Sequence, residues 1–258
     1  MSIVRSQIYY INSANRVSGT SSNFNYQFDI PDGSNFDSCL VLSMSIPRSY
    51  YLIRVTANTL ILSEGGVNVT VTITPGNYDA REFATILTTQ LNLNSPNGWI
   101  YSMTLNLQTA MYTFGVTGNS SQPSLIITSH LADQTGFDIN TTNTFVSNSL
   151  TSTNVINFVS TNCVFLHSDM VDDTTSVLQE VYSNNTQPYE YMVHESQHDM
   201  YTKKLKTNGS GLFTFSVTDF ENVEINLRGN DIAITLMLYK KLPIADLFKK
   251  FLEVIVKK

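Results

Sequence analysis

The chain has 258 residues, 42% of them hydrophobic, which suits one large β domain with a substantial core. Only 14% of the residues are charged and the net charge is −6, so direct binding of nucleic acid through counterion release is excluded. The sequence has no run of about 18 apolar residues and no secretory signal at its start, so we expect neither a membrane span nor secretion.

Strand-like alternation begins early in the chain. Residues 23–30 alternate aromatic and polar side chains, and a Pro-Asp-Gly turn follows them. The apolar run Cys39–Ile46 predicts a second strand, which Pro47 ends. We expect residues 1–22 to form an N-terminal arm.

Further short strands are predicted at intervals set by turn residues, and Gly65-Gly66 predicts a hairpin between the first two of them. The predicted strands are Thr59–Leu62, Val67–Thr74, Tyr101–Leu107, Met111–Thr117, Ser124–Thr128, Cys163–His167, Leu212–Thr218, Val223–Leu227 and Ile232–Tyr239. Many short strands with little helix indicate an all-β sandwich or barrel. The segment 140–154, rich in Asn, Thr and Ser, predicts an exposed loop.

One helix is predicted inside this β pattern. It runs from about Asp79 to Asn92, because Asp79 and Glu82 form a capping-box pattern ahead of an apolar face. We find no second domain, and we expect a single domain over residues 1–242.

Residues 243–258 form an amphipathic tail with apolar residues at helical spacing. Such a tail can dock into a neighbouring protein, lie on an internal membrane, or pack on its own domain. Its docking candidates are Leu247, Phe248, Phe251 and Ile255. Phe251–Val256 also suits a final strand.

Residues 194–198 match H-E-x-x-H, the motif in which two histidines on one helical face bind zinc and the glutamate acts as a base. The preceding residues 188–193 resemble a strand that enters a turn, and no histidine follows His198. We therefore interpret the motif as a chance match and keep His194 and His198 only as weak metal candidates. We expect no catalytic residue, no cofactor and no enzymatic activity.

The two cysteines, Cys39 and Cys163, lie far apart, each in an apolar run. A disulfide framework needs more cysteines in a smaller chain. We expect buried free thiols and a reducing compartment.

The tyrosine pairs Tyr9-Tyr10 and Tyr50-Tyr51 suit a core or subunit-interface role better than sugar stacking. A polar surface with little charge is typical of protein that will be buried against neighbours, because charged groups are depleted at interface cores.

Several stretches resemble the penton and related single jelly-roll capsid proteins of nucleocytoplasmic large DNA viruses, virophages and polinton-like viruses. The amino-terminal stretches are Tyr10–Ser13, Arg16–Thr20, Asn23–Tyr26 and Ile46–Tyr51, and the later ones are Gly76–Tyr78, Leu91-Asn92, Leu166–Asp169, Val177–Gln179, Thr218-Asp219 and Ile225–Asn230. The resemblance extends to about Tyr239, and the tail beyond Leu242 lies outside it.

The resemblance implies a single jelly-roll β-sandwich of about eight strands with the inserted helix and the tail. It implies pentamers at the five-fold vertices of an icosahedral double-stranded DNA virus capsid, in contact with the major capsid protein and possible minor capsid proteins. Arg5 and Arg16 in the N-terminal arm are then candidates for reaching a neighbour. The protein would be a virion component assembled in the host cytoplasm, without a separate spike domain and with only modest loops such as 140–154.

Three alternatives stay open beside a vertex protein. One is a minor capsid or cement protein. Another is a jelly-roll attachment protein that binds host glycans, which exposed aromatic residues in a shallow site would favour. The remote third is a zinc hydrolase built on His194, Glu195 and His198.

Overall fold

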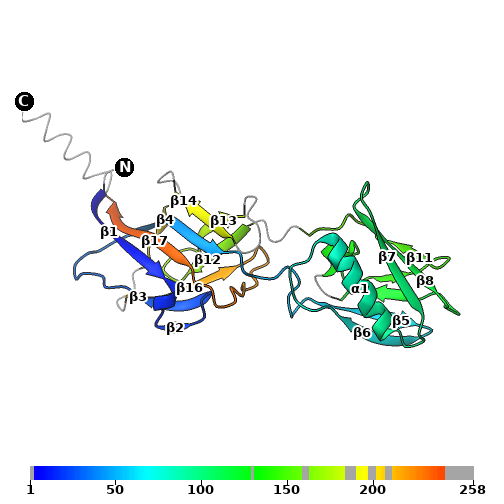
Figure 1. Cartoon of the computed structure of the whole chain (residues 1–258). Coiled ribbons are helices and arrows are strands. Elements are labelled where there is room, and N and C mark those ends of the chain that lie inside the picture. Colours follow the sequence, from blue (N-terminus) through cyan, green and yellow to red (C-terminus); the bar gives the residue numbers. More distant parts are fainter. Residues whose placement is uncertain are drawn as a thin grey trace, which may run out of the picture. The chain divides into compact units, whose positions relative to one another are not determined.

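The chain folds into two compact units with separate hydrophobic cores (Figure 1). The computed structural model describes residues 3–128, 131–158, 163–183, 190–196, 202–206 and 211–241. Unit 1 combines Met1–Tyr50 with Thr161–Lys258, and unit 2 is the segment Tyr51–Ser160. The expectation of one domain over residues 1–242 is therefore wrong, because the inserted segment buries its own apolar side chains.

The described part of unit 1 forms two antiparallel sheets. One sheet has the order β1-β17-β4-β14, with β15 also pairing with β4, and the other has the order β13-β12-β16-β3-β2. The elements are β1 Ile3–Asn12, the 3-10 helix Ser13–Asn15, β2 Ser18–Gly19, β3 Asn23–Gln27, β4 Ser38–Pro47, β12 Cys163–Ser168, β13 Val177–Tyr182, β14 Tyr191–Glu195, β15 Lys203–Lys204, β16 Leu212–Thr218 and β17 Ala233–Lys241.

The strand pairing in unit 1 defines a jelly roll. With the two-residue strands β2 and β15 set aside, the first strand pairs with the last (β1 with β17) and the second with the seventh (β3 with β16). The third pairs with the sixth (β4 with β14) and the fourth with the fifth (β12 with β13). Contacts of β17 with β4 and of β16 with β12 roll this long paired ribbon into two sheets. The all-β jelly-roll prediction is confirmed by this pairing.

The N-terminal segment differs from the expected arm. Ile3–Asn12 is a ten-residue strand, paired along its length with β17 at the edge of its sheet. Ile11 is buried and Tyr9 packs on the core, whereas Ile8 and Tyr10 face outward. Apolar residues on both faces hide the period-2 pattern that would have predicted this strand.

The predicted strand Val223–Leu227 is also wrong. Only an isolated bridge between Thr218 and Glu224 forms there. Ile225 and Leu227 are fully buried. The alternation of apolar and polar residues in this segment therefore results from packing on the core and not from a strand. The Asp219 carboxylate accepts hydrogen bonds from the Val223 N–H and a neighbouring backbone N–H, which holds this segment in a turn.

Aromatic side chains make the centre of the unit 1 core. Phe215 is fully buried, stacks on Phe24 with ring centroids 5.5 Å apart, and lies 6.1 Å from Phe28. Phe24 and Phe28 come from the predicted 23–30 strand, although β3 itself ends at Gln27. The alternation in the sequence thus identified the correct inward-facing aromatic residues.

The described part of unit 2 contains two sheets and two α-helices. The sheets have the orders β10-β9-β5-β6 and β11-β8-β7. The elements are β5 Thr59–Glu64, β6 Val67–Thr72, α1 Ala80–Asn94, β7 Ile100–Asn106, β8 Met111–Thr117, β9 Ser124–Ile126, α2 Leu131–Thr135, β10 Thr142–Thr144 and β11 Ser149–Thr151. The β5–β6 hairpin and the Asp79–Glu82 capping box are confirmed.

The expectation that the chain carries only modest loops, such as 140–154, and no separate domain is wrong as well. The segment 140–154 contributes β10 and β11 to the two sheets, and its Phe145 is buried in the unit 2 core. The chain therefore inserts a folded unit between the third and fourth strands of the jelly roll.

A buried carboxylate fastens the helix end of unit 2 to its sheet. Glu64 is fully buried and accepts hydrogen bonds from Ser95 Oγ (2.7 Å), the Tyr101 hydroxyl (2.8 Å) and the Asn97 backbone N–H (3.0 Å). Burial, and then the hydrogen bond to Glu64, raise the pKa of Tyr101. This network joins β5, the residues after α1, and β7.

We expect Phe215→Ala to lower the free energy of unfolding of unit 1 by about 3–5 kcal/mol, because it leaves a cavity in a fully buried site. Urea unfolding followed by circular dichroism should show the loss. Fluorescence of the single tryptophan, Trp99, reports unit 2 and should keep its midpoint. The control Phe220→Ala, at a 64% exposed side chain, should cost less than about 0.5 kcal/mol. Equal shifts of both signals would contradict two separate cores.

Glu64→Gln should lower the free energy of unfolding of unit 2 by about 1–3 kcal/mol, since the new amide NH2 group cannot accept from the donors around it. Trp99 fluorescence during urea unfolding measures this loss. Tyr101→Phe removes one of the donors and should have a smaller effect. An unchanged Trp99 midpoint in Glu64→Gln would show that the buried network does not hold unit 2 together.

Candidate assembly interface

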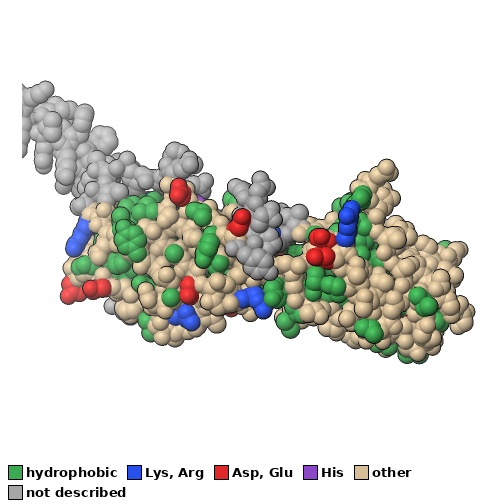
Figure 2. All heavy atoms as spheres, viewed as in Figure 1, with side chains coloured by type: hydrophobic (Ala, Val, Ile, Leu, Met, Phe, Trp, Pro, Cys, Tyr) green, Lys and Arg blue, Asp and Glu red, His purple; other side chains and the backbone are tan. Residues whose placement is uncertain are grey.

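On the outward face of the β1-β17-β4-β14 sheet, the strongly exposed apolar side chains lie on the two edge strands, β1 and β14. The register places Tyr10 beside Thr235 and Thr235 beside Ser43. On the next row Ser45 lies beside Val193 of β14. Alternate strand residues point to opposite faces, so these side chains share the face away from the core. Figure 2 shows hydrophobic side chains at the surface of unit 1, with few charged side chains between them.

The first edge is built by β1 and the segment before β2. Ile8 is 46% exposed and Tyr10 is 77% exposed, and Val17 is exposed nearby in the chain. Tyr9 points the other way: its ring packs edge-on against Phe28 at 4.9 Å and its hydroxyl donates to the Asp29 carbonyl. Partial burial raises the pKa of Tyr9. Of this predicted tyrosine pair, Tyr10 is therefore the residue available to a neighbour.

The two arginine candidates have different environments. Arg5 is exposed on β1. The Arg16 guanidinium donates to the carbonyls of Ser13 (2.8 Å) and Gly19 (3.1 Å) and lies 3.5 Å from an Asp231 carboxylate oxygen. Arg16 thus fixes the turn between β1 and β2 as well as lining the surface.

A polar pocket of about 580 Å³ adjoins Arg16. The Glu224 carboxylate in its wall accepts hydrogen bonds from Ser22 Oγ (3.1 Å) and Asn23 Nδ2 (3.2 Å). The lining residues are Arg16, Gly19, Thr20, Ser21, Ser22, Glu224, Asn226, Gly229 and Asp231. Hydroxyl, carboxylate and guanidinium groups thus converge there.

The second edge lies at the other end of both sheets, where β13 contacts β14. Tyr191 is 58% exposed and Val193 is 60% exposed, and Tyr182 of β13 is exposed as well. Sequence reasoning did not select these residues. Their signal is the alternation in 191–195, in which Met192 is buried between two exposed neighbours.

The Tyr50-Tyr51 pair is not a surface site. Tyr50 is only 5% exposed, belongs to the unit 1 core, and its hydroxyl lies 3.9 Å from Met192 Sδ. Tyr51 is half-buried and begins unit 2. The interface expectation is therefore wrong for Tyr50, whereas its alternative core role is confirmed.

The histidine motif begins on a strand. His194 and Glu195 lie on β14, where successive side chains point to opposite faces, so these two positions lack the helical geometry of a zinc site. His198 lies outside the described residues. Within the described ranges, no group of three or more His, Cys, Asp or Glu side chains is placed to hold a metal ion.

His194 instead lies in a partly desolvated environment. Its ring is half-buried, and its Nε2 atom is shielded from solvent without a hydrogen-bond partner among the described residues. Desolvation lowers the pKa of His194. The native state therefore resists taking up the proton that the unfolded chain accepts below about pH 6.5.

The lowered pKa of His194 predicts a pH-dependent stability of unit 1. The stability of unit 1 is unaffected by this shift above the pKa that His194 has in the unfolded chain. Its free energy of unfolding decreases as the pH falls below about 6.5, because only the unfolded chain then binds the proton readily. Urea midpoints measured by circular dichroism at pH 7.5 and 5.5 should fall further in the wild type than in His194→Gln. Equal falls in both proteins would show that His194 titrates normally.

Both cysteines are free. Cys39 is buried in the core, and burial raises the pKa of its thiol to about 12. Cys163 is half-buried, and burial together with the neighbouring Glu180 raises its pKa as well. Both thiols are therefore protonated and poorly reactive at neutral pH.

The tail candidates Leu247, Phe248, Phe251 and Ile255 lie outside the described residues. Their docking stays a prediction. No helix in the described part of the chain has the length and apolar character needed to cross a membrane.

Comparisons with solved structures find similar chains at low sequence identity. The mavirus penton protein superposes with a TM-score of 0.47 at 11% identity, covering 92% of this chain and all of that one. The D1-D2-D3 domains of the Escherichia coli flagellar cap protein FliD reach a TM-score of 0.22 at 12% identity, covering 83% of this chain and 56% of that one. No family model and no curated protein sequence matches. The jelly-roll assignment rests on the strand pairing itself.

Proposed function

We propose that this protein is a structural capsid subunit, and in particular the penton subunit that forms pentamers at the five-fold vertices of an icosahedral double-stranded DNA virus. The observation that carries this proposal is the pair of edges at opposite ends of the jelly-roll sheets, each of which exposes apolar and aromatic side chains. One edge presents Ile8 and Tyr10, and the other presents Tyr191 and Val193. The fold alone would not suffice, since jelly rolls serve many functions.

A closed ring of identical subunits needs two different, complementary patches on each subunit, because every contact joins one patch to the other. The two edges are different surfaces and lie at opposite ends of the sheets, as a ring requires. Aromatic residues are favoured and charged residues depleted at the centre of such contacts. The low charged fraction of the whole chain, 14%, agrees with extensive burial against neighbours.

The partners that follow from this role are further copies of the chain, the surrounding major capsid protein, and minor capsid proteins or an internal membrane for residues 243–258. Unit 2 gives the subunit a second folded body for such contacts. The two free thiols suit assembly in the host cytoplasm before incorporation into the virion.

The polar pocket beside Arg16 favours a second candidate function, attachment to host glycans. Its hydroxyl and carboxylate groups suit hydrogen bonding to sugar hydroxyls. None of its lining residues is aromatic, so it offers no ring on which a sugar could stack. A capsid role is therefore the better supported function.

Native mass spectrometry of the full chain over a range of concentrations tests the ring. We expect pentamers in the wild type. Tyr10→Asp and Val193→Asp should each raise the concentration for half-assembly at least about tenfold, because each places a carboxylate in a desolvated contact. Phe220→Asp, at a similarly exposed side chain that follows β16 and lies on neither edge strand, is the matched control and should assemble as the wild type does.

Two results would contradict the penton proposal. One is a wild-type monomer at every concentration, including in the presence of purified major capsid protein. The other is normal assembly of both edge variants, which would place the contacts elsewhere on the molecule.

A further inference from the structure

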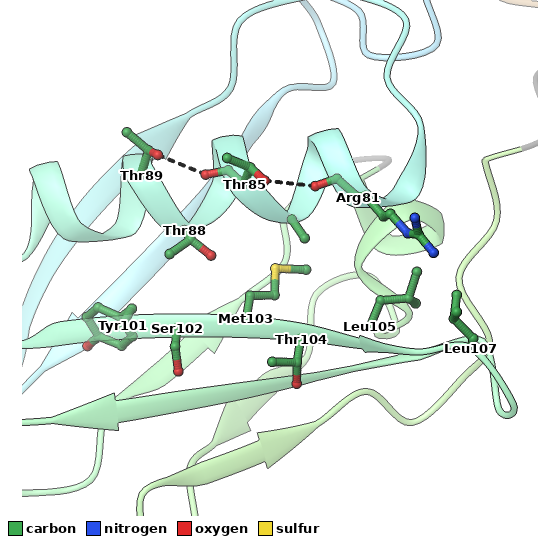
Figure 3. A pocket seen from close by; sticks show the side chains of 11 residues that line it. Arg81, Thr85, Thr88, Thr89, Tyr101, Ser102, Met103, Thr104, Leu105 and Leu107 are labelled. Carbon is green, nitrogen blue, oxygen red and sulfur yellow. Dashed lines mark hydrogen bonds between the residues drawn. The ribbon is translucent and has the colours of Figure 1, made fainter.

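Unit 2 has a groove between helix α1 and strand β7 (Figure 3). Its volume is about 580 Å³. The helix lines it with Arg81, Ala84, Thr85, Thr88 and Thr89, and the strand side contributes Tyr101, Ser102, Met103, Thr104, Leu105 and Leu107. All of these residues belong to unit 2, so the groove is complete within that unit.

Among the described strands, β7 pairs only with β8 and is therefore the edge of its sheet. The Val116 N–H of β8 donates to the Asn148 carbonyl on the far side, toward β11. Its partner on β7, Tyr101, therefore directs its own N–H and carbonyl away from β8, since backbone groups alternate along an antiparallel strand. By the same alternation, Met103 and Leu105 present their N–H and carbonyl groups to the free edge.

The side chain of Asn92 already pairs with the backbone of β7 at one position of its free edge. Its amide oxygen accepts from the Tyr101 N–H (2.6 Å), and its amide nitrogen donates to the Tyr101 carbonyl (3.1 Å). One carboxamide from α1 thus supplies the donor and the acceptor that a neighbouring strand would supply. Among the described residues, no corresponding group pairs with the edge at Met103 or Leu105, which leaves a template for another strand.

The walls of the groove suit an extended peptide. Met103 and Leu105 are partly buried and pack on the unit 2 core, so they offer an apolar floor. Thr85 and Thr89 donate their hydroxyls to carbonyls of their own helix, at 3.0 and 2.8 Å, which leaves a neutral wall. The groove therefore fits side chains that are apolar at every second position.

Arg81 gives one end of the groove a positive charge. Figure 3 shows its guanidinium at the end of the groove where Leu105 and Leu107 lie. Within the part of the chain that the structure describes, the Arg81 guanidinium is not paired with a carboxylate. A carboxylate is the group that complements it.

We propose that this groove binds an extended peptide segment of a partner protein by strand addition to β7. The peptide pairs its backbone with Met103 and Leu105, packs alternate apolar side chains on them, and places a carboxylate at Arg81. Strand addition of this kind gives affinity through the main chain and specificity through alternate side chains. This binding activity goes beyond a structural capsid role and does not depend on it.

The test uses the full chain labelled with ¹⁵N and two synthetic peptides, Thr-Val-Thr-Val-Thr-Val-Asp and its reverse, Asp-Val-Thr-Val-Thr-Val-Thr. We expect the amide signals of Met103 and Leu105 to shift and their hydrogen exchange to slow. The tighter of the two peptides shows the strand direction. A version N-methylated at every second residue removes the donors that face β7, and its binding should be lost.

Variants locate the binding on the protein. Thr88→Arg fills the groove and should abolish the shifts. Leu93→Arg, an exposed position of the same helix outside the groove, is the matched control and should bind normally. Arg81→Gln should weaken the aspartate peptide about two- to fivefold and leave an asparagine version unchanged.

Three results would overturn the proposal. The first is that the Met103 and Leu105 amide signals do not shift at millimolar peptide. The second is that they shift equally with the N-methylated peptide, which indicates apolar adsorption. The third is that these amides are already protected from exchange in the free full chain and lose this protection when residues 242–258 are removed, which makes the chain's own tail the occupant.

Discussion

The pairing of the first strand with the last holds unit 1 together. β1 lies antiparallel to β17 from Ile3 opposite Lys241 to Asn12 opposite Ala233. At the turn beyond β1, the Ser13 hydroxyl donates to Asp231 (2.7 Å) and accepts from the Ile232 N–H (3.0 Å). Because β17 also pairs with β4, this contact sets the order of the whole β1-β17-β4-β14 sheet.

The same constraint explains how the chain tolerates a large insertion. The jelly roll joins strands from the two ends of the sequence, so its ladders do not run through the segment Tyr51–Ser160. That segment buries its own side chains around Phe114, Tyr112 and Phe83. Two cores in one chain separate two tasks: unit 1 presents the proposed assembly edges, and unit 2 presents the β7 groove.

Closing the roll also creates the exposed edges. Among the described strands, β1 pairs with β17 alone and is therefore an edge strand, and β14 is the edge at the other end of the sheet. Long edge strands favour pairing with other chains unless they are covered. A capsid subunit can use such edges for contact, and this is the physical basis of the proposed ring.

The sequence predicted local patterns well and long-range relations poorly. Aromatic alternation identified Phe24 and Phe28 as core residues, and the capping box placed the start of α1 at Asp79. The two-unit division was missed because both units are rich in strands, and no change of composition marks residues 51 or 160. Tyr10 and Tyr50 look equivalent as members of tyrosine pairs.

Only tertiary position separates those two tyrosines. Tyr10 points outward from an edge strand, whereas Tyr50 packs against Met192, which comes from a distant strand. The second edge could not be predicted for a related reason. Tyr191 and Val193 directly precede the histidine motif, and the sequence does not show that their side chains are exposed. Which face of β14 is exposed depends on its pairing with β4, and that pairing spans more than half of the chain.

The most direct test of the account is a disulfide trap between the two edges. The variant Tyr10→Cys/Val193→Cys, with Cys163→Ser to remove the half-buried thiol, would be oxidised mildly and examined on non-reducing gels. The account predicts a covalent ladder that ends at five chains, while each single cysteine variant stays uncrosslinked. A covalent dimer from one cysteine alone, or no crosslink in the double variant, would contradict edge-to-edge assembly.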